Sequence, residues 1–226
     1  MSAINFPARF ITFEGGEGTG KSTQITRLSS YLNEINAECI VSREPGGSPG
    51  GEEIRKLLVE GEPSRWDSKT ETLLHFAARR DHLIRTIIPA LENGYWVLSD
   101  RFVDSTFAYQ GHGHGISLGL LNDFYEFVSE NIKPDLTFVL DLPVRTGLKR
   151  TRGREKAINS NNQENRYEKM DSEFHEHVRK GYLEIAKADP SRCVVLDAGA
   201  NPDRVFEVIK KNIRERYLDG IYRDKD

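Results

Sequence analysis

The hydrophobic residues of this chain fall into short runs that alternate with segments of helical spacing. The runs cover residues 9–14, 38–42, 95–100, 135–142 and 192–197. Each run is almost continuously apolar, which is typical of strands that are buried on both faces of a parallel sheet. The pattern therefore predicts five short strands in the interior of the protein.

The segments between these runs place apolar residues three or four positions apart, as an amphipathic helix does. Helical spacing covers residues 21–32, a segment that starts near 51, and residues 67–91, 117–130, 171–188 and 202–216. Strands that alternate with helices predict a parallel sheet between two helical layers. Because no repeat or long linker interrupts the pattern, we expect residues 1–226 to form a single α/β domain.

Residues 145–166 break this regularity, since they are polar and have no clear apolar face after Leu148. Between 145 and 156 there are six Lys or Arg residues and one Glu. We predict a flexible lid over 145–166, and the alternative is a solvated basic face of a helix.

Composition adds a few limits to this prediction. The chain has 226 residues and a formal net charge of -3, so no overall positive field favours nucleic acid or an anionic membrane. No apolar run approaches the ~18 residues of a membrane span, and we expect a cytoplasmic protein. Cys39 and Cys193 lie in apolar contexts and are expected to be buried, reduced thiols.

The most informative local motif follows the first predicted strand. Residues 15–22, GGEGTGKS, match the pattern G-x-x-x-x-G-K-[ST] and precede a predicted helix. Successive backbone N–H groups of such a loop, with the positive end of the helix, bind phosphates. The predicted ATP-binding residues are Gly15, Gly16, Glu17, Gly18, Thr19, Gly20, Lys21, Ser22 and Thr23. A glycine-rich turn without a ligand is the alternative.

A phosphate-binding loop alone leaves the reaction open among switch GTPases, motors, transporter ATPases and small-molecule kinases. Asp100 ends the third predicted strand and Arg101 follows it, at the sheet edge where ligands of α/β proteins bind. Ser22 and Asp100 are suited to Mg²⁺, and Arg101 is suited to a second phosphate. A surface ion pair is the alternative for Asp100 and Arg101.

Several motifs together resemble the thymidylate kinase family. They are FEGGEGTGKST, REPGG, FAARR, DRFVDSTFAYQG, LDLP and RYE, in this order over roughly residues 9–200. The resemblance implies a P-loop nucleoside monophosphate kinase fold and the phosphorylation of dTMP to dTDP with ATP and Mg²⁺, in dTTP biosynthesis. It also implies a homodimer.

The resemblance further implies roles for individual residues. Arg43 and Arg101 would bind the dTMP phosphate, Phe76 would stack on thymine and Arg80 would contact its edge. Glu17 and Tyr109 would lie near the sugar. Ser105, Thr106 and Gln110 would lie near the polar edge of the base. Phe76 can also be read as a core residue.

The expected catalytic residues are Lys21, Glu17, Arg101, Arg152 and Arg154. Some family members carry an arginine in the P-loop where this chain has Gly18, so a lid arginine is expected to supply that charge. Arg152 and Arg154 are the first candidates, and Arg166 is a third. Other P-loop kinases, a nucleotide-dependent switch and a nucleic-acid-dependent ATPase remain the competing functions.

Overall fold

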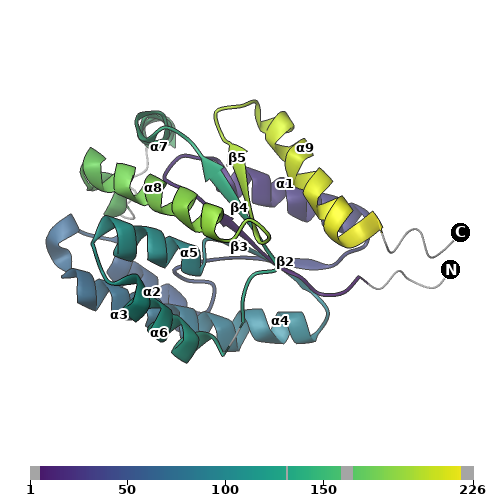
Figure 1. The fold of residues 1–226 in the computed structure, drawn as a ribbon, viewed down its shortest axis with the longest axis horizontal. Coiled ribbons are helices and arrows are strands. Elements are labelled where there is room, and N and C mark those ends of the chain that lie inside the picture. The colour runs from purple at the N-terminus through teal and green to yellow at the C-terminus, as the bar shows by residue number, and fades with distance from the viewer. Residues whose placement is uncertain (1–5, 131, 159–164, 220–226) are drawn as a thin grey trace, which may run out of the picture.

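The computed structural model describes residues 6–130, 132–158 and 165–219, with only the backbone for 154–158. It contains one five-stranded parallel sheet in the order β2-β3-β1-β4-β5, with helices on both faces (Figure 1). The strands are β1 (Phe10–Glu14), β2 (Cys39–Arg43), β3 (Trp96–Asp100), β4 (Leu136–Asp141) and β5 (Cys193–Asp197). The predicted three-layer α/β fold with five parallel strands is confirmed.

The helices lie mostly where the spacing predicts them. They are α1 (Lys21–Glu34), α2 (Pro49–Val59), η1 (Pro63–Arg65), α3 (Ser68–His82), η2 (Leu83–Ile87), α4 (Ile88–Glu92), α5 (Val103–Thr106), η3 (Phe107–Gly113), α6 (Leu118–Ser129), α7 (Val144–Ile158), η4 (Tyr167–Lys169), α8 (Ser172–Ala188), α9 (Pro202–Ile213) and η5 (Arg214–Leu218). Polar caps fix several starts: the Asp67 side chain accepts from the Lys69 and Thr70 N–H groups, and Asp171 accepts from Phe174 N–H.

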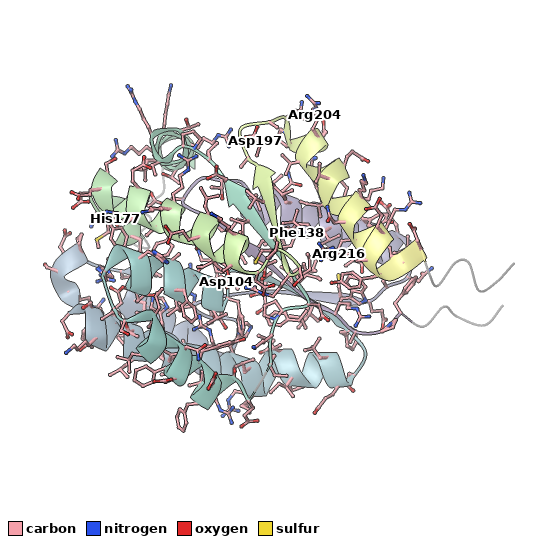
Figure 2. The ribbon with its side chains drawn as sticks, viewed as in Figure 1. Asp104, Phe138, His177, Asp197, Arg204 and Arg216 are labelled. Atoms are coloured by element: carbon pink, nitrogen blue, oxygen red, sulfur yellow. The ribbon has the colours of Figure 1, made fainter. Side chains whose placement is uncertain are left out.

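The two faces of the sheet are buried by different helices. Ile11 and Phe13 of β1 belong to the core that contains the apolar residues of α1 and α9, whereas Phe10 belongs to the core with α3 and α6. Figure 2 shows Phe138 of β4 in the interior and Arg204 of α9 at the periphery. Burial of each such aromatic or aliphatic side chain contributes about 1.5–3 kcal/mol.

The long predicted helix over 67–91 is one continuous path with a local change of pitch. The segment η2 forms a π-helical turn between α3 and α4 and ends two residues before Pro89. Proline has no N–H to donate and its ring crowds the preceding turn, so a wider turn at this point relieves the conflict.

The predicted lid segment begins as a helix, α7, which corresponds to the alternative of a basic helix face. Gly147 and Thr151 are buried and Leu148 is partly buried, whereas Lys149, Arg150 and Arg152 are exposed. Three residues on one side are thus enough to hold the helix against the domain. Residues 159–164 lie outside the described residues, and the movement of a lid stays a prediction.

Candidate active site

The glycine-rich loop connects β1 to α1 at the carboxyl edge of the sheet. Gly15 and Gly18 have φ angles of 132° and 66°, which favour glycine. A Cβ at Gly15 would overlap the Leu140 carbonyl oxygen, and one at Gly18 would overlap that of Gly147. The glycines are therefore required both for the conformation of this loop and for its close packing against β4 and α7.

Lys21 lies inside the curve of this loop. Its side-chain amino group donates to the carbonyl oxygens of Gly15 and Gly16 at 3.2 and 3.1 Å. Burial lowers the pKa of Lys21, and the nearby Arg101 guanidinium lowers it further. The ammonium group thus has backbone partners that an anionic phosphate can replace.

Ser22 and Asp100 meet at the mouth of the same loop. Ser22 Oγ donates to Asp100 Oδ2 at 3.2 Å. Two oxygen ligands from the protein fit Mg²⁺, which takes its other ligands from water and substrate phosphates. Among the described residues, no group of three or more His, Cys, Asp or Glu is placed to hold a metal ion. Ser22 and Asp100, the two residues predicted for Mg²⁺, thus lie within hydrogen-bond distance of each other at the loop.

A second pocket opens beside the loop, with a cavity volume of about 130 Å³. The predicted site residues that line it are Glu17, Arg101, Ser105, Thr106, Tyr109 and Gln110. Polar residues that line it without having been predicted as site residues are Glu44, Arg55, His75, Arg79, Tyr167 and Glu168. The pocket is thus assembled from segments that are far apart in sequence.

Arg101 joins the two sites. Its Nη1 donates to Gly15 O of the loop at 2.8 Å, and its Nη2 donates to Glu17 Oε1 at 2.9 Å. The guanidinium also lies over the Tyr109 ring, 5.1 Å from its centre. One cation therefore borders both the phosphate-binding loop and the second pocket.

Glu17 is the acidic group between the two sites. Besides Arg101, the Tyr109 hydroxyl donates to Glu17 Oε1 at 2.8 Å. Burial opposes the charged form of Glu17, but Arg101, Lys21 and the Tyr109 hydroxyl outweigh it and lower the pKa to about 2. Glu17 is therefore a carboxylate at neutral pH and can accept a hydrogen bond from a ligand hydroxyl.

Phe76 and Arg80 do not line this pocket. Phe76 is 3% exposed and packs against Phe124 of α6, with ring centres 5.5 Å apart. Arg80 donates to Val128 O at 2.9 Å and to Glu130 Oε1 at 2.6 Å. Both side chains point toward α6, so the core reading of Phe76 applies.

The neighbouring pair, His75 and Arg79, faces the pocket instead. These two residues are also four apart and thus share a face of α3, about 100° from the face of Phe76 and Arg80. Arg79 is 2% exposed, and its Nη2 donates to Thr106 Oγ1 at 3.0 Å. Its Nη1 is buried without a hydrogen-bond partner. A ligand oxygen could accept from that nitrogen.

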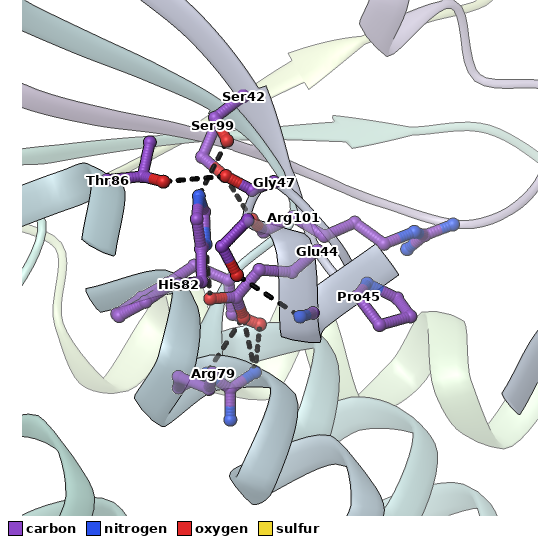
Figure 3. Close-up of polar contacts among 12 residues, drawn as sticks. Ser42, Glu44, Pro45, Gly47, Arg79, His82, Thr86, Ser99 and Arg101 are labelled. Atoms are coloured by element: carbon purple, nitrogen blue, oxygen red, sulfur yellow. Dashed lines mark hydrogen bonds and ion pairs between the residues drawn. The ribbon is translucent and has the colours of Figure 1, made fainter. Parts of the chain in front are cut away.

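Glu44 fixes the orientation of Arg79. Arg79 Nε donates to Glu44 Oε2 at 2.8 Å, and the other carboxylate oxygen lies 3.0 Å from His82 Nδ1 (Figure 3). Burial raises the pKa of Glu44, but the Arg79 charge and the His82 hydrogen bond outweigh it and lower the pKa. The ion pair is buried, so Arg79 is held firmly in place.

His75 and Tyr167 form another wall of the pocket. His75 Nε2 lies 2.8 Å from the Tyr167 hydroxyl, and the Tyr167 ring meets Tyr109 edge-on at 5.4 Å. Burial lowers the pKa of His75 to about 4 despite the opposing effect of Glu71. The imidazole is thus neutral at pH 7 and can serve as a flat partner for a ring.

Ser105, Thr106 and Gln110 lie on α5 and η3, where the sequence pattern gave no helix. Gln110 Nε2 donates to Glu71 Oε1 at 2.7 Å, and Thr106 accepts from Arg79. Ser105 Oγ and Glu14 Oε2 share a hydrogen bond of 2.6 Å. These side chains are therefore each tied to a partner beneath the pocket surface.

Arg43 and Arg55 are arranged differently from the prediction. Arg43 is half exposed and donates to Glu52 Oε2 at 2.9 Å, and it does not line the pocket. Arg55 lines the pocket from α2 and donates to Pro45 O at 2.7 Å. Arg55 lies on the helix predicted to start near Gly51, but nothing in the sequence distinguishes it from other surface arginines.

The arginines considered for the lid lie in three situations. Arg152 is exposed on α7, and the side chain of Arg154 lies outside the described residues. Arg166 is 1% exposed and donates to Pro63 O at 2.8 Å, with a further contact of 2.6 Å to Glu71 Oε2. The Arg166 guanidinium group is therefore buried and bonded within the protein.

A smaller cavity lies on the other side of the loop, between the start of α1 and the segment after β5. Thr19, Gly20, Arg150 and Ala198 are among its lining residues. Arg150 Nη1 donates to Ala198 O at 3.1 Å. This cavity is suited to the base of a nucleotide whose phosphates occupy the loop.

Comparison with known proteins agrees with this geometry. A family model described as thymidylate kinase matches residues 13–209. A thymidylate kinase of Caulobacter vibrioides is 50% identical over 207 residues, which are 92% of this chain and 96% of that protein. One of Bradyrhizobium diazoefficiens is 46% identical over 210 residues, which are 93% of this chain and 90% of that protein.

A solved structure gives the same result for the fold. The crystal structure of thymidylate kinase from Ehrlichia chaffeensis superimposes with a TM-score of 0.72 at 33% identity and covers 91% of this chain and 98% of that one. Among the described residues, no helix is long and apolar enough to span a membrane. These matches show that the chain belongs to the thymidylate kinase family.

Proposed function

We propose that this protein transfers the γ-phosphoryl group of ATP to the phosphate of dTMP, in the cytoplasm, and so forms dTDP for dTTP synthesis. The observation that carries the proposal is the position of Arg101, which donates to Gly15 O of the P-loop and lines the second pocket. Donor and acceptor phosphates bound in these sites would meet at one guanidinium group.

The donor site is the P-loop. Its N–H groups and Lys21 would bind the β- and γ-phosphates, and the cavity beside Arg150 and Ala198 would take adenine. Ser22 and Asp100 would hold Mg²⁺, which neutralises phosphate charge when it is bound. The ATP base would thus lie on the opposite side of the loop from the acceptor.

The acceptor phosphate has two cations in reach. Arg101 and Arg55 both line the pocket, and guanidinium groups bind phosphate through two parallel hydrogen bonds. Glu17 is ionised and can accept from the 3′-hydroxyl of the sugar. The Tyr109 ring lies against that region and would crowd a 2′-hydroxyl, which favours deoxynucleotides.

The acceptor base has a matching polar and apolar environment. The unpaired Arg79 Nη1 can donate to a pyrimidine carbonyl oxygen, which would satisfy a buried donor. The neutral His75 imidazole offers a flat face for the ring. Thr106 and Gln110 border the same part of the pocket. This set suits thymine, and we assign the base contacts to His75 and Arg79 on this basis.

The reaction itself needs positioning and charge neutralisation more than proton transfer. The attacking phosphate oxygen is already anionic, so a strong general base is not required. Lys21 and Arg101 would bind the transferred group from two sides, and Arg152 or Arg154 of the lid would add a third charge. Closure of the lid would also exclude water from the transferred group.

We also propose that the protein works as a homodimer. Exposed apolar side chains on α3, η2 and α6 include Leu73, Ile84, Leu118, Leu120 and Phe127, of which Phe127 is 83% exposed. A second copy of the chain would bury them. Phe127→Glu should halve the mass measured by light scattering, whereas a monomeric wild type would contradict the dimer.

The test of function is ATP consumption with different acceptors. dTMP should stimulate ATP turnover strongly, while thymidine, CMP and AMP should not, and EDTA should abolish the activity. Stimulation by thymidine instead of dTMP would indicate a deoxynucleoside kinase. Slow hydrolysis that no acceptor changes would indicate a nucleotide-dependent switch, and would overturn the proposal.

A further inference from the structure

The backbone at Arg101 has an unusual conformation. Directly after β3 its φ angle is 71°, in the left-handed region that few residues other than glycine adopt. This turn directs the Arg101 side chain back over the P-loop, where Nη1 reaches Gly15 O. Because the conformation is disfavoured, other contacts must hold it.

Three hydrogen bonds fix the backbone of this turn. Arg101 N donates to Phe13 O at 2.9 Å, and Ser99 Oγ donates to Arg101 O at 2.7 Å. The next residue, Phe102, donates its N–H to Glu14 Oε1 at 2.7 Å. The last of these bonds depends on a carboxyl side chain at the end of β1 that is fully buried.

The second carboxyl oxygen of Glu14 connects to the Arg101 guanidinium group through side-chain hydroxyl groups. Ser105 Oγ lies 2.6 Å from Glu14 Oε2 and 2.7 Å from the Tyr182 hydroxyl. Arg101 Nη1 in turn donates to the Tyr182 hydroxyl at 2.8 Å. Glu14 therefore connects to Arg101 both through the backbone and through two hydroxyl groups.

We propose that Glu14 is a positioning residue for phosphoryl transfer: it holds Arg101 between the P-loop and the acceptor pocket through Phe102 N–H and the Ser105 hydroxyl. Glu14 does not line the acceptor pocket and thus acts through Arg101. This inference rests on the proposed function, since it requires that Arg101 binds the acceptor phosphate.

The protonation state of Glu14 also affects how strongly Arg101 can attract a phosphate. The ionisable groups that interact with it are Arg101, Asp104, Lys21, Tyr182 and Cys193. Burial, followed by the Asp104 charge, raises the pKa of Glu14 to about 8 against the effects of Ser105 and Arg101. A neutral Glu14 leaves the positive charge of Arg101 available to phosphate, whereas an ionised Glu14 would offset part of it.

Two substitutions separate these effects. Glu14→Gln keeps an acceptor for Phe102 N–H and a polar group beside Ser105, so at pH 7 its KM for dTMP should stay within about threefold of wild type. Glu14→Ala removes both contacts and should lower kcat/KM for dTMP by about ten- to hundredfold, with KM for ATP almost unchanged. Between pH 7 and 9, KM for dTMP should rise in wild type but less in Glu14→Gln.

Thr12→Val is the matched control. Thr12 lies on the same strand, is fully buried and shares a hydrogen bond of 2.7 Å with Thr137, away from Arg101. It should lower the melting temperature without a change in KM for dTMP. If Glu14→Ala does not fold, Ser105→Ala carries the test through the second contact, and should also raise KM for dTMP selectively.

The outcomes are distinguishable. A wild type without activity toward dTMP would overturn the proposed function, and with it the role of Arg101. An active wild type with unchanged kinetics in folded Glu14→Ala, or with ATP and dTMP affected equally, would overturn only the positioning role. An unchanged KM in Ser105→Ala would do the same where Glu14→Ala is unfolded.

Discussion

The donor and acceptor sites lie side by side but are built in different ways. The donor site is a run of consecutive residues, 15–23, whose backbone conformation is set by glycines. The acceptor pocket takes side chains from α2, α3, α5, η3 and η4 and from the segment that follows β3. We expect backbone groups to bind phosphate in the first site and positioned side chains to recognise a ligand in the second.

This difference has a physical consequence. A loop of consecutive residues depends mainly on local backbone angles, so its geometry follows from the local sequence. A pocket of distant side chains depends on how each helix is rotated about its own axis. A rotation of one residue, about 100°, exchanges Arg79 for Arg80 at the pocket surface. The following predictions test this contrast, from the largest expected effect to the smallest.

Lys21→Met should have the largest effect. Its ammonium group lies within the P-loop, and its loss removes a charge from the transferred phosphoryl group, so kcat should fall by about 10³-fold. The affinity for dTMP, measured by calorimetry, should change little because Lys21 does not line the acceptor pocket. The exposed Lys187 provides the control substitution, and equal losses in both variants would contradict the assignment.

The adjacent arginines of α3 give a direct comparison. Arg79→Leu should raise KM for dTMP by about 10–100-fold, since a charged hydrogen bond contributes ~1.5–3 kcal/mol. It should also destabilise the fold, because the buried Glu44 loses its partner. Arg80→Leu removes a contact with Glu130, at a half-exposed position, and should leave KM within about threefold. Steady-state kinetics measure both effects. A larger rise of KM in Arg80→Leu than in Arg79→Leu would contradict the assignment of Arg79 to the acceptor pocket.

Arg55 and Arg43 form a second pair of this kind. Arg55→Ala should raise KM for dTMP by about tenfold, because one of two cations near the phosphate is lost. Arg43→Ala should have a smaller effect, since its side chain pairs with Glu52 outside the pocket. Thymidine, which has no phosphate, serves as a competitive ligand whose affinity should not respond to Arg55→Ala.

The smallest effect concerns the pH dependence of stability. His75 has a pKa of about 4 in the folded protein, below the usual value of 6.5. Between these values the unfolded chain binds more protons, so the free energy of unfolding rises with pH and falls as the pH drops from 6.5 toward 4. In His75→Phe this loss should be smaller by about 1–2 kcal/mol. Urea unfolding at pH 7 and 4.5 measures this loss of unfolding free energy. An equal loss in wild type and His75→Phe would contradict the burial of His75.

Much of the fold could be predicted from the sequence because each strand is a short apolar run. The helix over 103–113 was missed, since its polar side chains serve the pocket and its glycines resemble a loop. Phe76 and Arg80 are four residues apart, which is the spacing expected of a ring that stacks on a base and an arginine that contacts the edge of that base. His75 and Arg79 have the same spacing, and the packing of Phe76 on Phe124 turns the second pair toward the pocket.

The sequence by itself determined the strand–loop–helix at residues 10–34, the order of strands and helices along the chain, and the family. Glycine conformation and apolar periodicity are local properties, so they can be read directly. Only the tertiary structure decided which arginine of α3 lines the second pocket, and that Glu14 contacts the turn that carries Arg101. Those contacts join residues up to 91 positions apart in sequence, and packing between helices and sheet, rather than local preference, brings them together.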